Sequence, residues 1–151
     1  MCMVPTARTA REGKYETTAG VVKFAVGQSG SIVFLTPITM SLPAERYTLR
    51  AHLERDDPVE PNSFPGLLGT NIQLRRRRAV GGVENVLVIA AGQGASLLRG
   101  ENGIYTVDGP GKELDEGIDV QKHFYWLQVE VQQQTPATAQ TRNAVIALEL
   151  L

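Results

Sequence analysis

Four consecutive arginines, Arg75–Arg78, are the residues of this sequence best suited to a specific chemical interaction. Each guanidinium carries several N–H donors in a planar fork that fits a carboxylate or a phosphate. In a β-strand successive side chains point to opposite faces, so Arg75 and Arg77 share one face while Arg76 and Arg78 share the other. A strand with cations on both faces is costly to bury, and we therefore expect an edge strand or a protruding hairpin.

Three interpretations of this arginine run stay open. The charges can keep a solvated edge strand from pairing with other strands. They can dock on carboxylates of another protein, because arginine suits bidentate pairing. They can also contact nucleic acid, although no aromatic residues that would stack on bases flank the run. If a two-residue turn at residues 81–82 closes the hairpin, Arg78 lies opposite Asn85.

Motifs for catalysis or for metal binding are not evident. His52 and His123 fall on separate expected strands, and neither has a histidine or cysteine partner at a spacing that binds zinc. The glycine-rich residues 92–94 follow an apolar run, but no helix that would hold a phosphate comes after them. The nucleophile pattern G-x-S-x-G is missing. We therefore expect no catalytic residue, no cofactor and no metal site.

The composition predicts a single globular domain made in a reducing compartment. The chain has 151 residues, with 15 basic and 16 acidic side chains, so it has no overall field to attract nucleic acid or an anionic membrane. Its one cysteine, Cys2, cannot form an internal disulfide, which fits the cytoplasm. The first residues lack the apolar core of a signal peptide, and no stretch is long and apolar enough to span a bilayer.

The elements that must position the arginines are strands. Residues 46–55 alternate clearly, with Leu49 and Leu53 on one face and Arg50 and Glu54 on the other. Short β-branched and aromatic runs recur along the chain, separated by glycine- and proline-rich turns, and no convincing helix of ten residues is present. The expected strands lie within residues 21–26, 31–36, 46–55, 71–80, 83–91, 95–99, 104–107, 120–131 and 141–151. This pattern predicts an all-β fold, a β-sandwich or jelly roll of about 8–9 strands.

Residues 1–19 are expected to differ from the rest. They lack apolar periodicity and carry Arg8, Arg11 and Lys14 among acidic side chains. Such a segment is typical of a flexible arm that becomes ordered on a partner surface. We therefore expect an extended N-terminal arm over residues 1–19 and a β-sandwich domain over residues 20–151. In this interpretation Arg8, Arg11 and Lys14 join Arg75–Arg78 as residues that dock on a partner.

Three expected strands are apolar on both faces, which is unusual for a sandwich that is wet on its outside. They lie within residues 86–91, 123–127 and 144–151. Either another chain covers part of the outer surface, or the arm and the long loops do so. Under the first alternative, Phe124 and Trp126 are the residues that we expect in an oligomer interface.

Taken together, a cysteine-poor β-sandwich with a polar arm and two-faced apolar strands resembles the decoration or cement proteins of tailed phages. The resemblance is one of organisation over the whole chain and involves no diagnostic motif. It implies a virion structural protein that is made in the host cytoplasm, binds the major capsid protein and self-associates as a dimer or trimer. It also implies that neither nucleic acid nor a membrane is the partner.

Two other classes of protein stay open. One is a ligand-binding module, such as a carbohydrate-binding sandwich or a phage tail accessory. A module of this kind would need exposed aromatic side chains on one face, where Tyr125 or Trp126 could serve. The other is an enzyme of an unrecognised family, which the missing catalytic motifs disfavour.

Overall fold

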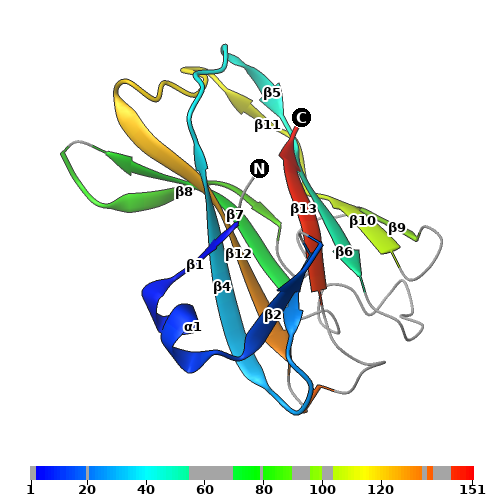
Figure 1. The fold of residues 1–151 in the computed structure, drawn as a ribbon. Helices are drawn as coiled ribbons and strands as arrows, with labels where there is room; N and C mark the ends of the chain where they lie inside the picture. The colour runs from blue at the N-terminus through cyan, green and yellow to red at the C-terminus, as the bar shows by residue number, and fades with distance from the viewer. Residues whose placement is uncertain are drawn as a thin grey trace.

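The computed structural model describes residues 3–19, 21–54, 70–78, 80–89, 96–99, 104–133, 136–137 and 144–151 (Figure 1). Within these ranges the chain forms a short helix, α1 (Ala7–Glu12), and the strands β1 (Val4–Pro5), β2 (Tyr15–Thr18), β3 (Val21–Phe24), β4 (Gly30–Ile38), β5 (Glu45–Tyr47), β6 (Leu49–Glu54), β7 (Thr70–Arg78), β8 (Val83–Ile89), β9 (Ser96–Arg99), β10 (Ile104–Asp108), β11 (Lys112–Leu114), β12 (His123–Gln133) and β13 (Ala144–Leu150).

Most of these strands belong to two antiparallel sheets. Sheet A has the strand order β1-β4-β12-β7-β8, and sheet B has the order β2-β3-β13-β6-β10-β9. The short strands β5 and β11 pair with each other at one end of the molecule (Figure 1). The structure thus confirms the predicted all-β fold and the β-sandwich architecture.

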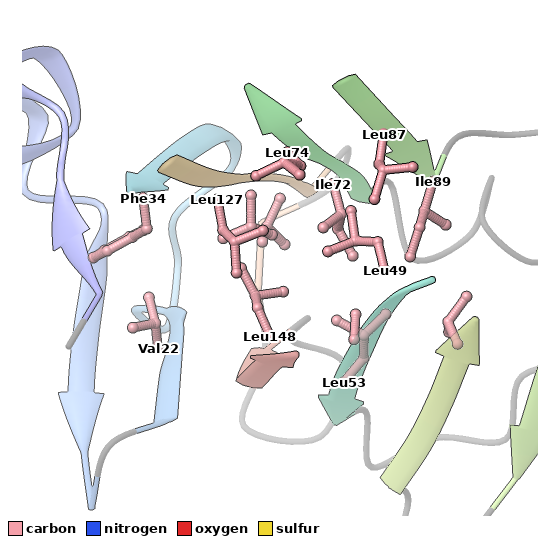
Figure 2. Close-up of a cluster of buried hydrophobic side chains, with 14 of the residues drawn as sticks. Val22, Phe34, Leu49, Leu53, Ile72, Leu74, Leu87, Ile89, Leu127 and Leu148 are labelled. Carbon is pink, nitrogen blue, oxygen red and sulfur yellow. The ribbon is translucent and has the colours of Figure 1, made fainter. Parts of the chain in front are cut away.

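The core lies between the two sheets because each strand turns one of its two faces inward. Sheet A contributes buried side chains such as Ile72, Leu74 and Leu127, and these face Leu53 and Leu148 from sheet B (Figure 2). In β6 the burial alternates strictly along the strand, as the sequence pattern predicts. The hydrophobic effect therefore fixes which face of each strand points inward.

Strand β13 lies inside sheet B, which agrees with the apolar end of the sequence. It pairs with β6 along most of its length, and Leu151 continues the ladder through two backbone hydrogen bonds with Thr48. Strand β3 pairs with β13 only at Ala144 and Val145. Beyond these two residues, the β3 side of β13 has no strand partner among the described residues.

The N-terminal segment is part of the sandwich, and this corrects the expectation of an extended arm. Strand β1 pairs with β4 at one edge of sheet A, and β2 pairs with β3 at one edge of sheet B. Between them, the hydroxyl oxygen of the buried Thr9 in α1 accepts a 2.8 Å hydrogen bond from the backbone N–H of Val33. The ring of Tyr15 packs edge-on against Phe34, with 4.9 Å between the ring centroids. The domain therefore begins before residue 20.

Sequence patterns missed this segment because its contacts are not periodic. The helix is only six residues long, and its ends are fixed by single residues. The hydroxyl of Thr6 accepts from the N–H of Thr9 at the N-cap, and Gly13 takes the left-handed conformation (φ 60°) that ends the helix. Individual side chains, and not an apolar face, attach α1 to the sheet.

We expect Thr9→Val to lower the free energy of unfolding by about 1–3 kcal/mol, because the substitution leaves the Val33 N–H without its acceptor. The matched change Thr17→Val, at an exposed position of β2, should alter it by less than about 0.5 kcal/mol. Urea denaturation of both variants checks this expectation. Equal stability of the two variants would show that the hydrogen bond between Thr9 and Val33 contributes nothing to stability.

Candidate binding face

The outer face of sheet A is built from alternate residues of four adjacent strands. One row across the sheet runs from Pro37 through Trp126 and Arg75 to Asn85, on β4, β12, β7 and β8 respectively. The next row in one direction consists of Leu35, Gln128, Gln73 and Val88. On the other side of Trp126, Phe124 pairs with Arg77 on β7. This face thus combines aromatic rings, guanidinium groups and side-chain amides.

The two aromatic residues of this face differ greatly in exposure. Phe124 is 58% exposed, whereas Trp126 is only 9% exposed although it points away from the core. The cover of Trp126 comes from its neighbours: the Phe124 ring lies 5.5 Å away between centroids, and the guanidinium carbon of Arg75 lies 5.7 Å from its ring. The indole therefore needs no second chain to shield it, while Phe124 stays open to solvent.

Polar side chains hold this cluster in place. The Gln128 Oε1 atom accepts hydrogen bonds from Arg75 Nη1 at 3.1 Å and from Trp126 Nε1 at 3.4 Å. Further along β12, Glu130 accepts a 2.6 Å hydrogen bond from the hydroxyl of Ser31. Because these groups are already paired, the rings beside them are fixed before any ligand arrives.

A hollow of about 400 Å³ adjoins the exposed Phe124. Its lining includes Arg77, Arg78, Lys122 and His123. Arg77 is exposed and forms no ion pair with the part of the chain that the structure describes. The hollow therefore presents an aromatic edge next to an available guanidinium.

The arginine run does not lie on an edge strand, which corrects our expectation. Strand β7 is an inner strand between β12 and β8, and Arg76 pairs in register with Glu84. A bulge at Val86 and a longer connection between the strands shift the predicted register, in which Arg78 faced Asn85. The expectation of a protruding hairpin agrees with the way β7 and β8 extend away from the rest of the molecule (Figure 1).

An inner strand tolerates Arg76 because neighbouring groups pair with it. Its guanidinium forms a close ion pair with Glu84 and lies 3.8 Å from Glu116. It also donates to the hydroxyl of Tyr125 at 3.4 Å, with its carbon 6.0 Å from the ring centroid. Arg78 forms a second ion pair with Glu84 at 3.1 Å. Arg76 thus covers the end of the core while its charge is compensated.

These contacts shift the pKa values of both partners. The hydrogen bond from Arg76, together with the charges of Arg76 and Arg78, holds the pKa of the Glu84 carboxyl below its usual range, although partial desolvation opposes the shift. For Arg76, burial is the largest single effect and lowers the pKa, but the hydrogen bonds to Tyr125 and Glu84, together with the charges of these two groups, raise the pKa overall. Elsewhere, the bidentate hydrogen bonds from Arg50 lower the pKa of Asp108.

The other predicted docking residues are not part of this face. Arg8 and Arg11 lie on α1, beside the β1 edge of sheet A, and Arg8 pairs with Glu12 at 2.9 Å. Lys14 lies 3.6 Å from the same carboxylate. The structure therefore does not gather the predicted cations into one patch with Arg75–Arg78.

Sequence reasoning identified Phe124, Trp126 and the arginines but missed the polar part of the face. The signal was present in the outward positions of β12, where Gln128, Glu130 and Gln132 follow the two aromatic residues at every second position. The alternate inward positions are apolar, so the pattern separates a core side from a polar side. The partner strands that complete the face could not be assigned without the sheet order.

The described residues contain neither a cluster of metal-ligating side chains nor a long apolar helix. No group of three or more histidine, cysteine, aspartate or glutamate residues is arranged there to hold a metal ion. Among the described helices, none has the length and apolar character that crossing a membrane requires.

Comparison with known proteins assigns no family. No family model matches the sequence, and no curated protein matches it. Among solved structures, the carbohydrate-binding module TmCBM61, solved in complex with β-1,4-galactotriose, is a distant neighbour with a TM-score of 0.44 and 13% sequence identity. The alignment covers 99% of this chain and 86% of that one. A likeness this remote carries no argument about the ligand of the present chain.

The lowered pKa of Glu84 predicts a loss of stability in acid. A carboxyl with a folded-state pKa below its ordinary value of about 4.3 stabilises the fold fully above that value. This contribution is lost as the pH falls through the folded-state pKa. We expect Glu84→Gln to be less stable than the native protein at pH 7 and to lose less stability between about pH 5 and pH 3.

Urea denaturation across this pH range measures the effect. The control is Glu113→Gln, because Glu113 is exposed in the same region and forms no ion pair with the described residues. It should follow the native pH profile. A native-like profile for Glu84→Gln would show that the pair with Arg76 does not contribute to stability. Both variants should still lose some stability in acid, because the pKa of Asp108 is also lowered and neither substitution changes this carboxyl.

Proposed function

We propose that this chain is a non-catalytic binding module and that the outer face of sheet A binds carbohydrate. The observation that carries the proposal is the exposed Phe124 ring, set beside the fixed Trp126–Arg75 pair and a row of side-chain amides. Phe124 is the exposed aromatic side chain among the described residues of this face, which carries both apolar and polar side chains.

The chemistry of a sugar matches such a surface. One face of a pyranose ring carries C–H groups and packs on an aromatic ring, while the hydroxyls at its rim act both as donors and as acceptors. Side-chain amides and carboxylates supply the complementary groups, and Gln73, Gln128 and Glu130 lie in adjacent rows beside the aromatic cluster. An open face of this kind suits a chain of sugars better than a small buried ligand.

The contacts that already engage the arginines also support carbohydrate binding over docking on a protein through a basic strand. Arg75 is committed to Trp126 and Gln128, and Arg76 is committed to Glu84 and Tyr125. Neither Arg75 nor Arg77 forms an ion pair within the described residues, but Arg75 is held by the Trp126 ring and by Gln128, whereas Arg77 is exposed. A single available guanidinium beside Phe124 suits one carboxylate, such as that of a uronic acid, better than an extended acidic protein surface.

The interpretation as a capsid decoration protein stays a prediction from the organisation of the sequence. This includes docking on a major capsid protein, assembly as a dimer or trimer through Phe124 and Trp126, and location in a virion. Self-association through this face would compete with a sugar for the same Phe124 ring, so one set of variants tests both proposals.

We expect the protein to bind soluble oligosaccharides, with tighter binding to oligomers that contain uronic acid than to neutral ones. Phe124→Ala should weaken binding about tenfold or more, which corresponds to about 1.4 kcal/mol, because the stacking surface is removed. Arg77→Ala should remove the preference for acidic sugars while leaving binding of neutral ones. A glycan array followed by isothermal titration calorimetry measures these effects.

The control is Val26→Ala, which shortens another exposed apolar residue, on the turn after β3 and away from this face. It should bind like the native protein. If no array glycan binds, or if Phe124→Ala binds as well as the native protein, the proposal is wrong. Light scattering completes the experiment: an oligomer that dissociates in Phe124→Glu would favour the interface interpretation.

A further inference from the structure

A second candidate site lies between the sheets, on the opposite side of sheet A from the binding face. It is a pocket of about 520 Å³. Strand β4 and the residues after it supply Thr36, Ile38 and Met40 to its wall, while Leu127 comes from β12 and Leu150 from β13. Val4, Pro37, Thr39 and Leu42 complete the lining.

The pocket exists because the strands on its two sides are not joined. Strand β3 pairs with β13 only at Ala144 and Val145, so the half of β13 that carries Leu150 pairs with β6 on one side and has no strand partner on its β3 side among the described residues. On the other side, β1 covers β4 only at Phe34 and Leu35. The two sheets therefore stay open toward Leu150 and Ile38, and mostly apolar side chains line the opening.

The wall contains one polar group that lacks a partner. Thr36 is only 2% exposed, and its hydroxyl oxygen forms no hydrogen bond within the described part of the molecule. A buried hydroxyl without a partner is unfavourable, and most such groups in proteins are paired. None of the residues that line the pocket is charged, so an ionised ligand group would find no counter-charge there.

We propose that this pocket binds a neutral apolar small molecule, such as a medium-chain alcohol, whose single hydroxyl group pairs with Thr36. The volume lies within the range of small-molecule sites, which are mostly apolar with a few placed polar groups. The apolar body of the ligand fills the space between Leu127 and Leu150. The hydroxyl oxygen of Thr36 is covered in this structure, so the side chain turns to another χ1 rotamer to receive the missing hydrogen bond from the ligand hydroxyl. The absence of charge excludes carboxylates and lipid headgroups as the preferred class.

Displacement of the fluorescent apolar probe N-phenyl-1-naphthylamine tests the proposal, with 1-decanol and decane as competitors. We expect the native protein to bind 1-decanol at least about fivefold more tightly than decane. Thr36→Val keeps the shape of the side chain but removes the hydroxyl. This variant should lose the preference for 1-decanol, bind decane undiminished, and show a higher melting temperature in the absence of ligand.

Thr39→Val is the matched control, because Thr39 lines the same pocket but is exposed. It should keep the preference for the alcohol. Leu150→Trp should block both competitors, with a melting curve to confirm that the variant folds. Phe124→Ala should leave decanol binding intact, so failure of carbohydrate binding and failure of this proposal are distinguishable.

Three outcomes would overturn the inference. One is the absence of probe or decanol binding by the native protein. Another is an unchanged alcohol preference in Thr36→Val, which would mean that Thr36 does not meet the ligand. Light scattering at the concentrations used adds a third arm: if the protein is an oligomer and the probe enters only after dilution to monomers, a second copy covers the pocket and the small-molecule proposal is wrong.

Discussion

Strand β12 contributes side chains both to the core and to the outer face of sheet A, and the rest of the structure depends on this double role. It is the central strand of sheet A and pairs with β4 on one side and β7 on the other over nine residue pairs each. Its inward side chains, including Leu127 and Val129, form the core, and its outward side chains begin the candidate face. Since the period of a strand is two, neither set can move without the other.

This coupling explains why the same segment looked two-faced in the sequence. Tyr125, Trp126 and Leu127 are consecutive and all buried, yet Trp126 lies on the opposite side from its two neighbours. Its burial comes from Arg75 and Phe124 and does not need the sandwich core. An arginine beside an indole supplies this cover, for which the sequence had suggested either another chain or the arm and the long loops.

The strands and the fold class were predictable from the sequence because apolar and polar residues alternate along strands such as β6. A strand with this alternation has one apolar face, which can be buried only against another sheet or element. The errors concern features that depend on individual contacts. Arg76 became acceptable on an inner strand only through Glu84 and Tyr125, and the bulge at Val86 gives no periodic signal. The helix of the N-terminal segment is attached to sheet A through the Thr9 hydroxyl. A single polar contact of this kind produces no apolar pattern in the sequence. The pocket at Thr36 depends on where β3 stops pairing, which is a property of sheet order.

The position of Trp126 has an optical consequence. It is the one tryptophan of the sequence, and its indole lies on the outer face of sheet A, in contact with Arg75 and next to the exposed Phe124. The two most deeply buried tyrosines, Tyr105 and Tyr125, point to the interior instead. Tryptophan emission therefore reports the surroundings of the outer surface, and tyrosine absorption reports the packing between the sheets. The tryptophan and the two buried tyrosines thus report on different layers of the sandwich, the outer face of sheet A and the space between the sheets.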